Sequence, residues 1–183
     1  MLIPTHPRCL GVLSLVRLWF ACLPGTIRYK ATFVAAIEVP NVQPPLKVFF
    51  NTAVNAAKAT AAKASVGNKV FHFDVTKNPL PTYLVAVAVG HFDQVKRTSR
   101  GIDYSIITPP GYAAYAELGL NASIHAVEYF GDRFGVPYSS MNTKLDSISV
   151  AGIDMDAMEN QGGLLGALVA MLTWCAGSLP PWR

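Results

Sequence analysis

Runs of β-branched and aromatic residues follow one another through the first half of the chain, between clusters of Pro, Gly and Asn. Residues 70–75 (VFHFDV) alternate strictly, and residues 83–89 form a continuous apolar run of the kind found in a strand buried on both faces. Residues 26–39 and 48–50 have similar strand character. Residues 53–64 are rich in Ala and Lys, and they are compatible with either a hairpin connection or a short helix. Together these runs predict an antiparallel β-domain.

The second half has a different pattern. Residues 103–108 read as a strand that ends at Pro109-Pro110-Gly111, and Lys144–Val150 reads as another strand. Between them, residues 112–134 predict a helix of about six turns that stops at Gly135. Its apolar side chains recur at helical spacing, at Leu118, Ile124, Val127, Phe130 and Phe134. Strand, helix and strand in this order indicate the opening of a mixed α/β domain.

Charge is divided unevenly along the 183 residues. Residues 1–97 carry 11 basic and 3 acidic side chains, whereas residues 98–183 carry 4 and 8, for a net charge of +4. We therefore expect a domain boundary near Lys96–Gly101, where the sign changes. With 51% hydrophobic residues, the composition excludes a disordered or collagen-like chain, and no dense basic run indicates a nucleic-acid partner.

Two apolar stretches bear on membranes and partners. Residues 9–23 are interrupted by Arg17 and are too short to span a bilayer, so membrane attachment is not expected. Residues 164–176 (LLGALVAMLTWCA) have a length typical of a buried helix, and we expect a protein partner to cover this tail. Cys9, Cys22 and Cys175 indicate neither a disulfide framework nor a cysteine zinc site, and we expect a cytoplasmic protein, with a membrane-associated or secreted one as the alternative.

One acidic cluster carries candidate chemistry. It runs DMDAMENQGG over residues 154–163, directly after the strand Lys144–Val150. A carboxylate at a strand edge can bind an ammonium through charge-assisted hydrogen bonds, while nearby backbone groups pair with an extended peptide. A solvated acidic loop is the alternative. His125 and Glu128 share a helix face, but two groups are fewer than the three protein ligands of a catalytic zinc, so packing is the better interpretation.

The cluster and four upstream blocks resemble one known family. Ala157-Met158-Glu159-Asn160 followed by Gly162 is similar to the G-A-M-E-N-x-G motif of the aminopeptidase N family of zinc metallopeptidases. The other blocks occur in the family's order and resemble its K-A-T-F with V-P, its S-T-Y-L-V-A with V-G-x-F, its F-G-V-P-Y and its K-L-D. They are residues 30–33 with 39–40, 81–86 with 89–92, 134–138 and 144–146.

The resemblance implies a fold and a set of roles. The expected fold is mainly β, a saddle-like antiparallel N-terminal domain (residues 28–97) followed by the partial start of a thermolysin-like α/β catalytic domain (residues 98–163). Residues 1–27 match poorly and residues 164–183 do not align. The implied substrates are peptide N-termini, and the implied cofactor is zinc. Glu159 would anchor the free α-amino group, Ala157 and Met158 would pair with the substrate backbone, and Asn160 would support the loop.

The sequence also departs from the family pattern. Asp156 stands where the family has Gly. In the family, the zinc-binding H-E-x-x-H and the more distant ligand Glu lie farther beyond the motif than Arg183, the last residue of this sequence. No catalytic or metal-binding residue is therefore assigned in this chain. We expect a zinc-aminopeptidase relative that binds peptide N-termini but is inactive alone. A noncatalytic, β-rich protein-interaction module is the alternative.

Overall fold

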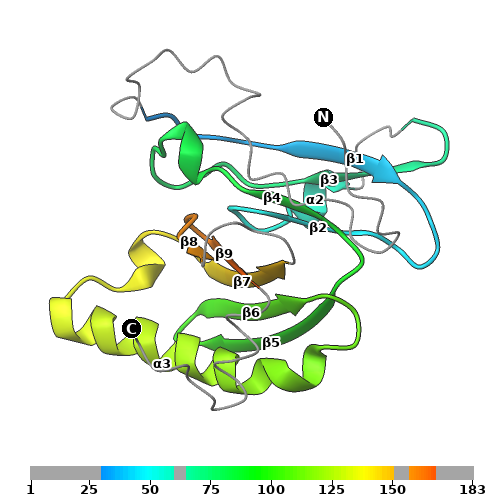
Figure 1. The fold of residues 1–183 in the computed structure, drawn as a ribbon. Helices are drawn as coiled ribbons and strands as arrows, with labels where there is room; N and C mark the ends of the chain where they lie inside the picture. The colour runs from blue at the N-terminus through cyan, green and yellow to red at the C-terminus, as the bar shows by residue number, and fades with distance from the viewer. Residues whose placement is uncertain (1–29, 60–64, 151–156, 168–183) are drawn as a thin grey trace. The chain divides into compact units, whose positions relative to one another are not determined.

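The computed structural model describes residues 30–59, 65–150 and 157–167. Their contacts form two compact units. The first contains the described residues up to His91 together with Asn160–Gly162, and the second contains Phe92–Glu159 and the described residues from Gly163 onward. The described residues are mainly β with few helices (Figure 1).

The first unit is built from two antiparallel strand pairs. Its strands are β1 (Ala36–Pro40), β2 (Lys47–Phe50), β3 (Asn68–His72) and β4 (Val87–Gly90). β1 pairs with β3 and β2 pairs with β4, with Ala36 opposite His72 and Lys47 opposite Gly90. The antiparallel pairing expected from the runs of β-forming residues is confirmed.

A small aromatic and aliphatic core holds the first unit together. Phe50 and Phe73 are 4% and 1% exposed, and their ring centroids lie 5.4 Å apart in a tilted arrangement. Val39, Val48 and Val85 are buried around them. Burying one such side chain contributes about 1.5–3 kcal/mol, so this cluster stabilises the unit.

Three strand predictions in this unit are wrong in part. Of residues 70–75, only the part up to His72 belongs to a strand, β3, and Phe73 forms an isolated bridge with Val54. Residues 83–89 do not form one strand, because a 3₁₀ helix, η2 (Thr82–Leu84), precedes β4. Its turn is closed by the Leu84 N–H, which donates to the carbonyl of Pro81 at 3.1 Å. Within residues 26–39, only β1 is a strand among the described positions, and residues 26–29 lie outside them.

The Ala-rich segment contains a short helix. α2 (Ala56–Ala59) is one turn long, and the side chain of Asn55 accepts a hydrogen bond from the Lys58 N–H at 3.0 Å. Asn55 therefore caps the start of this turn. The short-helix alternative is confirmed for these four residues, while residues 60–64 lie outside the described ranges.

The second unit is a five-stranded mixed sheet with one long helix. Its elements are β5 (Asp93–Ser99), β6 (Ile102–Thr108), η3 (Ala113–Tyr115), α3 (Ala116–Phe134), η4 (Tyr138–Ser140), β7 (Lys144–Val150), β8 (Ala157–Met158) and β9 (Gly163–Ala167). The strand order is β5-β6-β7-β9-β8. β6 pairs in parallel with β7, and α3 forms the crossover between them along β5 and β6 (Figure 1).

β5 is a strand that the hydrophobic pattern does not predict, because its sequence is mostly polar. β5 is the edge strand of the sheet and pairs with β6 through the two-residue turn Arg100-Gly101. An edge strand tolerates charged and polar side chains because one side of it faces solvent. The charge pattern predicts a domain boundary at Lys96–Gly101. In the structure these residues form the end of β5 and this turn. The contacts divide the units between His91 and Phe92.

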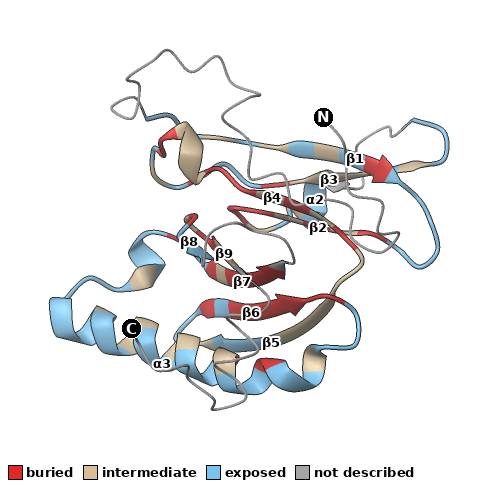
Figure 2. Ribbon diagram, in the orientation of Figure 1, coloured by how far each residue is buried: buried red, intermediate tan, exposed pale blue. Residues whose placement is uncertain are grey.

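α3 has the predicted position and end but buries a different face. Gly135 follows it with φ +67° in the left-handed region, as the Gly signal predicts. Ala116 and Leu120 are its buried residues, and Ile124 and Val127 pack against them. Leu118, Phe130 and Phe134 are instead 54–71% exposed. The exposed outer face of α3 contrasts with the buried strands β6 and β7 in Figure 2.

The apolar run after the acidic cluster begins as a strand. Gly163–Ala167 forms β9, which pairs in parallel with β7, so the prediction of a buried helix is wrong for residues 164–167. Periodicity cannot separate a short buried strand from a helix in a continuous apolar run. Residues 168–176 lie outside the described ranges.

Candidate functional site

The predicted peptide-binding residues begin on a sheet edge. Ala157 and Met158 form β8, whose backbone pairs antiparallel with Gly166 and Leu165 of β9. β8 is the last strand of the sheet, and among the described strands none pairs with its other side. Ala157 is exposed and Met158 is half-buried. An edge strand offers backbone N–H and C=O groups to an added extended peptide.

Glu159 follows β8 directly, and its side chain is exposed. A carboxylate in this position keeps its hydration and can still accept a charge-assisted hydrogen bond from an ammonium group. The chain thus brings an edge strand and an accessible acid together over three consecutive residues.

Asn160 is the buried member of the predicted group. It is 5% exposed, and its Nδ2 donates to the carbonyl of Tyr83 at 3.4 Å. Its Oδ1 is buried without a hydrogen-bond partner among the described residues. Asn160 therefore packs into the structure of the first unit, whereas Glu159 is exposed to solvent.

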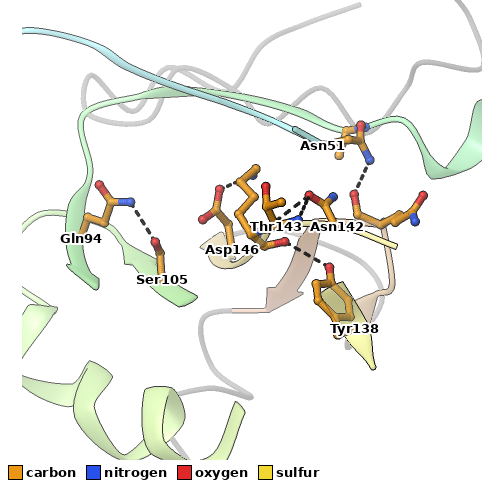
Figure 3. Close-up of polar contacts among 10 residues, drawn as sticks. Asn51, Gln94, Ser105, Tyr138, Asn142, Thr143 and Asp146 are labelled. Carbon is orange, nitrogen blue, oxygen red and sulfur yellow. Dashed lines mark hydrogen bonds and ion pairs between the residues drawn. The ribbon is translucent and has the colours of Figure 1, made fainter. Parts of the chain in front are cut away.

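Asn51 binds the backbone at Gln161, directly after Asn160. The sequence pattern indicated only a turn at Asn51 and no role in a site. Asn51 is 1% exposed and its Nδ2 donates to the carbonyls of Leu84 at 2.8 Å and Gln161 at 2.7 Å (Figure 3). Its Oδ1 accepts from the Ala86 N–H at 2.8 Å. One buried amide thus joins the end of β2 to residues 84–86 and to Gln161. Only the tertiary contacts identify it, because its partners lie 33 to 110 positions away.

A buried ion pair lies on β7, within the K-L-D block. Lys144 and Asp146 are 8% and 5% exposed, and the Nζ of Lys144 donates to Oδ2 of Asp146 (Figure 3). Burial lowers the pKa of Lys144, although the neighbouring Asp146 carboxylate opposes the shift. The Tyr138 hydroxyl donates to the Lys144 carbonyl at 3.2 Å. This pair stands in the core of the sheet and has a structural role.

The pair of His125 and Glu128 does not act together. Glu128 accepts a hydrogen bond from the Ser99 hydroxyl at 2.5 Å and lies 3.4 Å from the guanidinium of Arg100. His125 is exposed and its ring stacks on Tyr129. The packing interpretation therefore describes both residues.

Within residues 30–59, 65–150 and 157–167, no three His, Cys, Asp or Glu side chains are grouped so that they could hold a metal ion. No helix in those ranges is long and apolar enough to cross a membrane. Asp154, Asp156 and the three cysteines lie outside the described residues.

Known proteins similar to this chain are aminopeptidases. The puromycin-sensitive aminopeptidase of Caenorhabditis elegans is 29% identical over 154 residues, or 84% of this chain. The glutamyl aminopeptidase of Bos taurus is 42% identical over 85 residues, and aminopeptidase M1-C of Oryza sativa subsp. japonica is 32% identical over 136 residues. These alignments cover 46% and 73% of this chain. No protein-family model matches the chain.

The chain belongs to the aminopeptidase N family. The resemblance found in the five sequence blocks is confirmed by these relatives. The chain spans only 15%, 9% and 14% of the lengths of the three relatives. The similarity therefore covers only a small part of each relative. The activity and substrate of this chain are treated as proposals below.

Proposed function

We propose that this chain is the part of a zinc-dependent aminopeptidase that recognises the N-terminus of a peptide substrate. In this proposal the Glu159 carboxylate binds the α-ammonium group, and the backbone of Ala157 and Met158 pairs with the first residues of the peptide. Asn160 holds the loop in shape. The observation that carries the proposal is an exposed glutamate directly after a sheet-edge strand, one side of which pairs with no other described strand.

Physical chemistry supports these roles. A free ammonium bound to Glu159 explains a preference for chain ends, because an internal peptide nitrogen carries no charge and offers a weaker hydrogen bond. Pairing with the β8 backbone is independent of side chains, so it accepts peptides of many sequences. The first unit is proposed to be part of a β-saddle domain, and the second the start of a thermolysin-like domain. The mainly β composition and the similarity to aminopeptidases support this assignment.

Zinc enters the proposal as the cofactor of the family. The described residues do not fit it, since they contain no group of three ligating side chains. No step through a metal-bound water is therefore derived for this chain. Its own residues bind and orient a peptide, and we propose that the chain does not hydrolyse peptides by itself.

A binding experiment tests this proposal. A fluorescent tetrapeptide with a free N-terminus is titrated with the full chain and followed by anisotropy, in parallel with its N-acetylated form. Glu159→Gln should weaken binding of the free peptide about tenfold, since one charge-assisted hydrogen bond contributes about 1.5 kcal/mol. Glu117→Gln is the matched control, because Glu117 is another exposed glutamate of the second unit, paired with Arg97. It should leave binding unchanged.

Two results would contradict the proposal. Equal affinity for the free and acetylated peptides would show that no ammonium is recognised, and would favour a noncatalytic interaction module. Release of the N-terminal residue by the purified chain, together with stoichiometric zinc, would contradict the view that the chain is inactive alone.

A further inference from the structure

A cavity lies in the second unit, formed by different residues from those of the peptide motif. It has a volume of about 400 Å³ and lies among the C-terminal half of α3, the start of β6 and the segment from Gly135 to Ser139. Its walls combine the apolar side chains of Ile102 and Val127 with charged groups. This size and mixture are typical of a site for a small molecule.

The inner wall carries an unsatisfied hydroxyl. Tyr104 is 0% exposed and lines the cavity, and its hydroxyl has no hydrogen-bond partner among the described residues. Leaving a buried hydroxyl unpaired is unfavourable, and a ligand that brings an acceptor to it recovers that loss. Burial raises the pKa of Tyr104, so the group remains a protonated donor at neutral pH.

The rim carries three charges of both signs. Arg100 Nη1 donates to Asp132 Oδ1 at 2.7 Å, and Arg100 Nε lies 3.4 Å from Glu128 Oε2. These contacts use Nε and Nη1, and within the described ranges no contact uses Nη2. The side chains of Arg100 and Asp132 are 55% and 64% exposed, so both can reorient toward a ligand.

The backbone that presents Arg100 is itself unusual. Arg100 has φ +46° and Gly101 has φ +76°, so both residues of the turn between β5 and β6 are left-handed. Asn and Gly are the residues that such a turn prefers. An arginine in this conformation is strained, and residues in strained conformations cluster at ligand sites. This turn holds Arg100 where its side chain lines the cavity.

We propose that this cavity binds a small zwitterion, a free α-amino acid, between Arg100, Asp132 and Tyr104. The ligand carboxylate takes the N–H groups of Arg100. It reaches the Tyr104 hydroxyl only when the side chains that bury this hydroxyl move. The ligand ammonium takes the Asp132 carboxylate, and the aliphatic part lies against Ile102 and Val127. A phosphate or a dicarboxylate fits poorly, because Glu128 and Asp132 leave the rim with a net negative charge.

NMR titration of the ¹⁵N-labelled full chain tests this site. L-Leucine should shift the amide resonances of Gly131, Gly135 and Ser139 with a millimolar dissociation constant. N-acetyl-L-leucine lacks the ammonium and L-leucinamide lacks the carboxylate, so each should bind about tenfold more weakly. Tyr104→Phe and Asp132→Asn should each weaken L-leucine binding by a similar factor.

Control variants separate this proposal from the preceding one. Glu117→Gln breaks an exposed ion pair on the same helix, away from the cavity, and should leave L-leucine binding unchanged. Glu159→Gln should also leave these shifts unchanged, even if peptide binding at Glu159 fails. Asp132 is largely exposed, so its replacement tests the site even if the Tyr104 variant is unstable.

Three outcomes would overturn the proposal. The first is no shift of these resonances with L-leucine up to about 50 mM, well above a millimolar dissociation constant. The second is equal binding of leucine, its acetyl form and its amide. The third is unchanged binding by Asp132→Asn.

Discussion

The buried pair of Lys144 and Asp146 makes a sharp prediction about the stability of the second unit. Both side chains are at most 10% exposed and each is the other's charged partner on β7. Replacing one member leaves an uncompensated charge in the core, and this is much costlier than the net contribution of the pair. Lys144→Met, Asp146→Asn and the double variant therefore form an informative cycle.

The magnitude follows from the charge that each variant leaves behind. In Lys144→Met, the Asp146 carboxylate stays buried without its cation, which costs about 3–5 kcal/mol. In Asp146→Asn, the Lys144 ammonium can release its proton, which costs about 4.6 kcal/mol at pH 7 from a pKa of about 10.4.

The Asp146→Asn variant should respond to pH. Its loss of stability should shrink by about 1.4 kcal/mol per pH unit as the pH rises, because release of the Lys144 proton becomes easier. The double variant should cost only about 1–3 kcal/mol, since it leaves a neutral buried amide instead of a charge.

Hydrogen exchange of the β6 and β7 amides is the appropriate assay, because it reports on the second unit separately from the first. It is measured for the parent chain and the three variants at several pH values. A double variant whose loss equals the sum of the single losses within about 0.5 kcal/mol would refute the reasoning. Absence of a pH slope in Asp146→Asn would refute it as well.

Three further predictions concern Gly131, Asn51 and Tyr104. Gly131→Ala should stabilise α3 by about 0.5–1 kcal/mol, since the added Cβ meets Pro137 at an ordinary 3.6 Å, and a lower urea midpoint would contradict this. Asn51→Asp should destabilise the first unit by up to about 4 kcal/mol at pH 7 and by less in acid, because its carboxylate would face two carbonyl oxygens. Amide exchange in β2 and β4 checks that change, and equal exchange rates would refute it. Tyr104 has a raised pKa through burial, so its stabilising contribution is fully present below the ordinary value of 10.0 and is lost as the pH rises through the folded value. In urea unfolding at alkaline pH, the parent chain should lose free energy of unfolding as the pH rises. Tyr104→Phe should lack this loss, and an equal loss in both chains would contradict the prediction.

Local sequence signals were sufficient for several elements. The strand Lys144–Val150 has the predicted bounds, and the Gly135 signal marks the end of α3. These signals work because backbone preferences and side-chain alternation act within a few residues. The motif Ala157-Met158-Glu159-Asn160 could likewise be found in the sequence alone, since consecutive residues carry it. The sites themselves remain predictions that the binding experiments test.

Long-range packing decided the features that the sequence pattern left out or misread. β5 is polar yet pairs with β6 as an edge strand, and the buried face of α3 runs through Ala116 and Leu120 instead of Phe130 and Phe134. Asn51 becomes important only because Leu84, Ala86 and Gln161 meet around its amide. Sequence thus determined which segments can be strand or helix and which family the chain resembles. Which faces are buried, and which polar groups find partners, depended on the tertiary structure, because burial and hydrogen bonding join residues far apart in the chain.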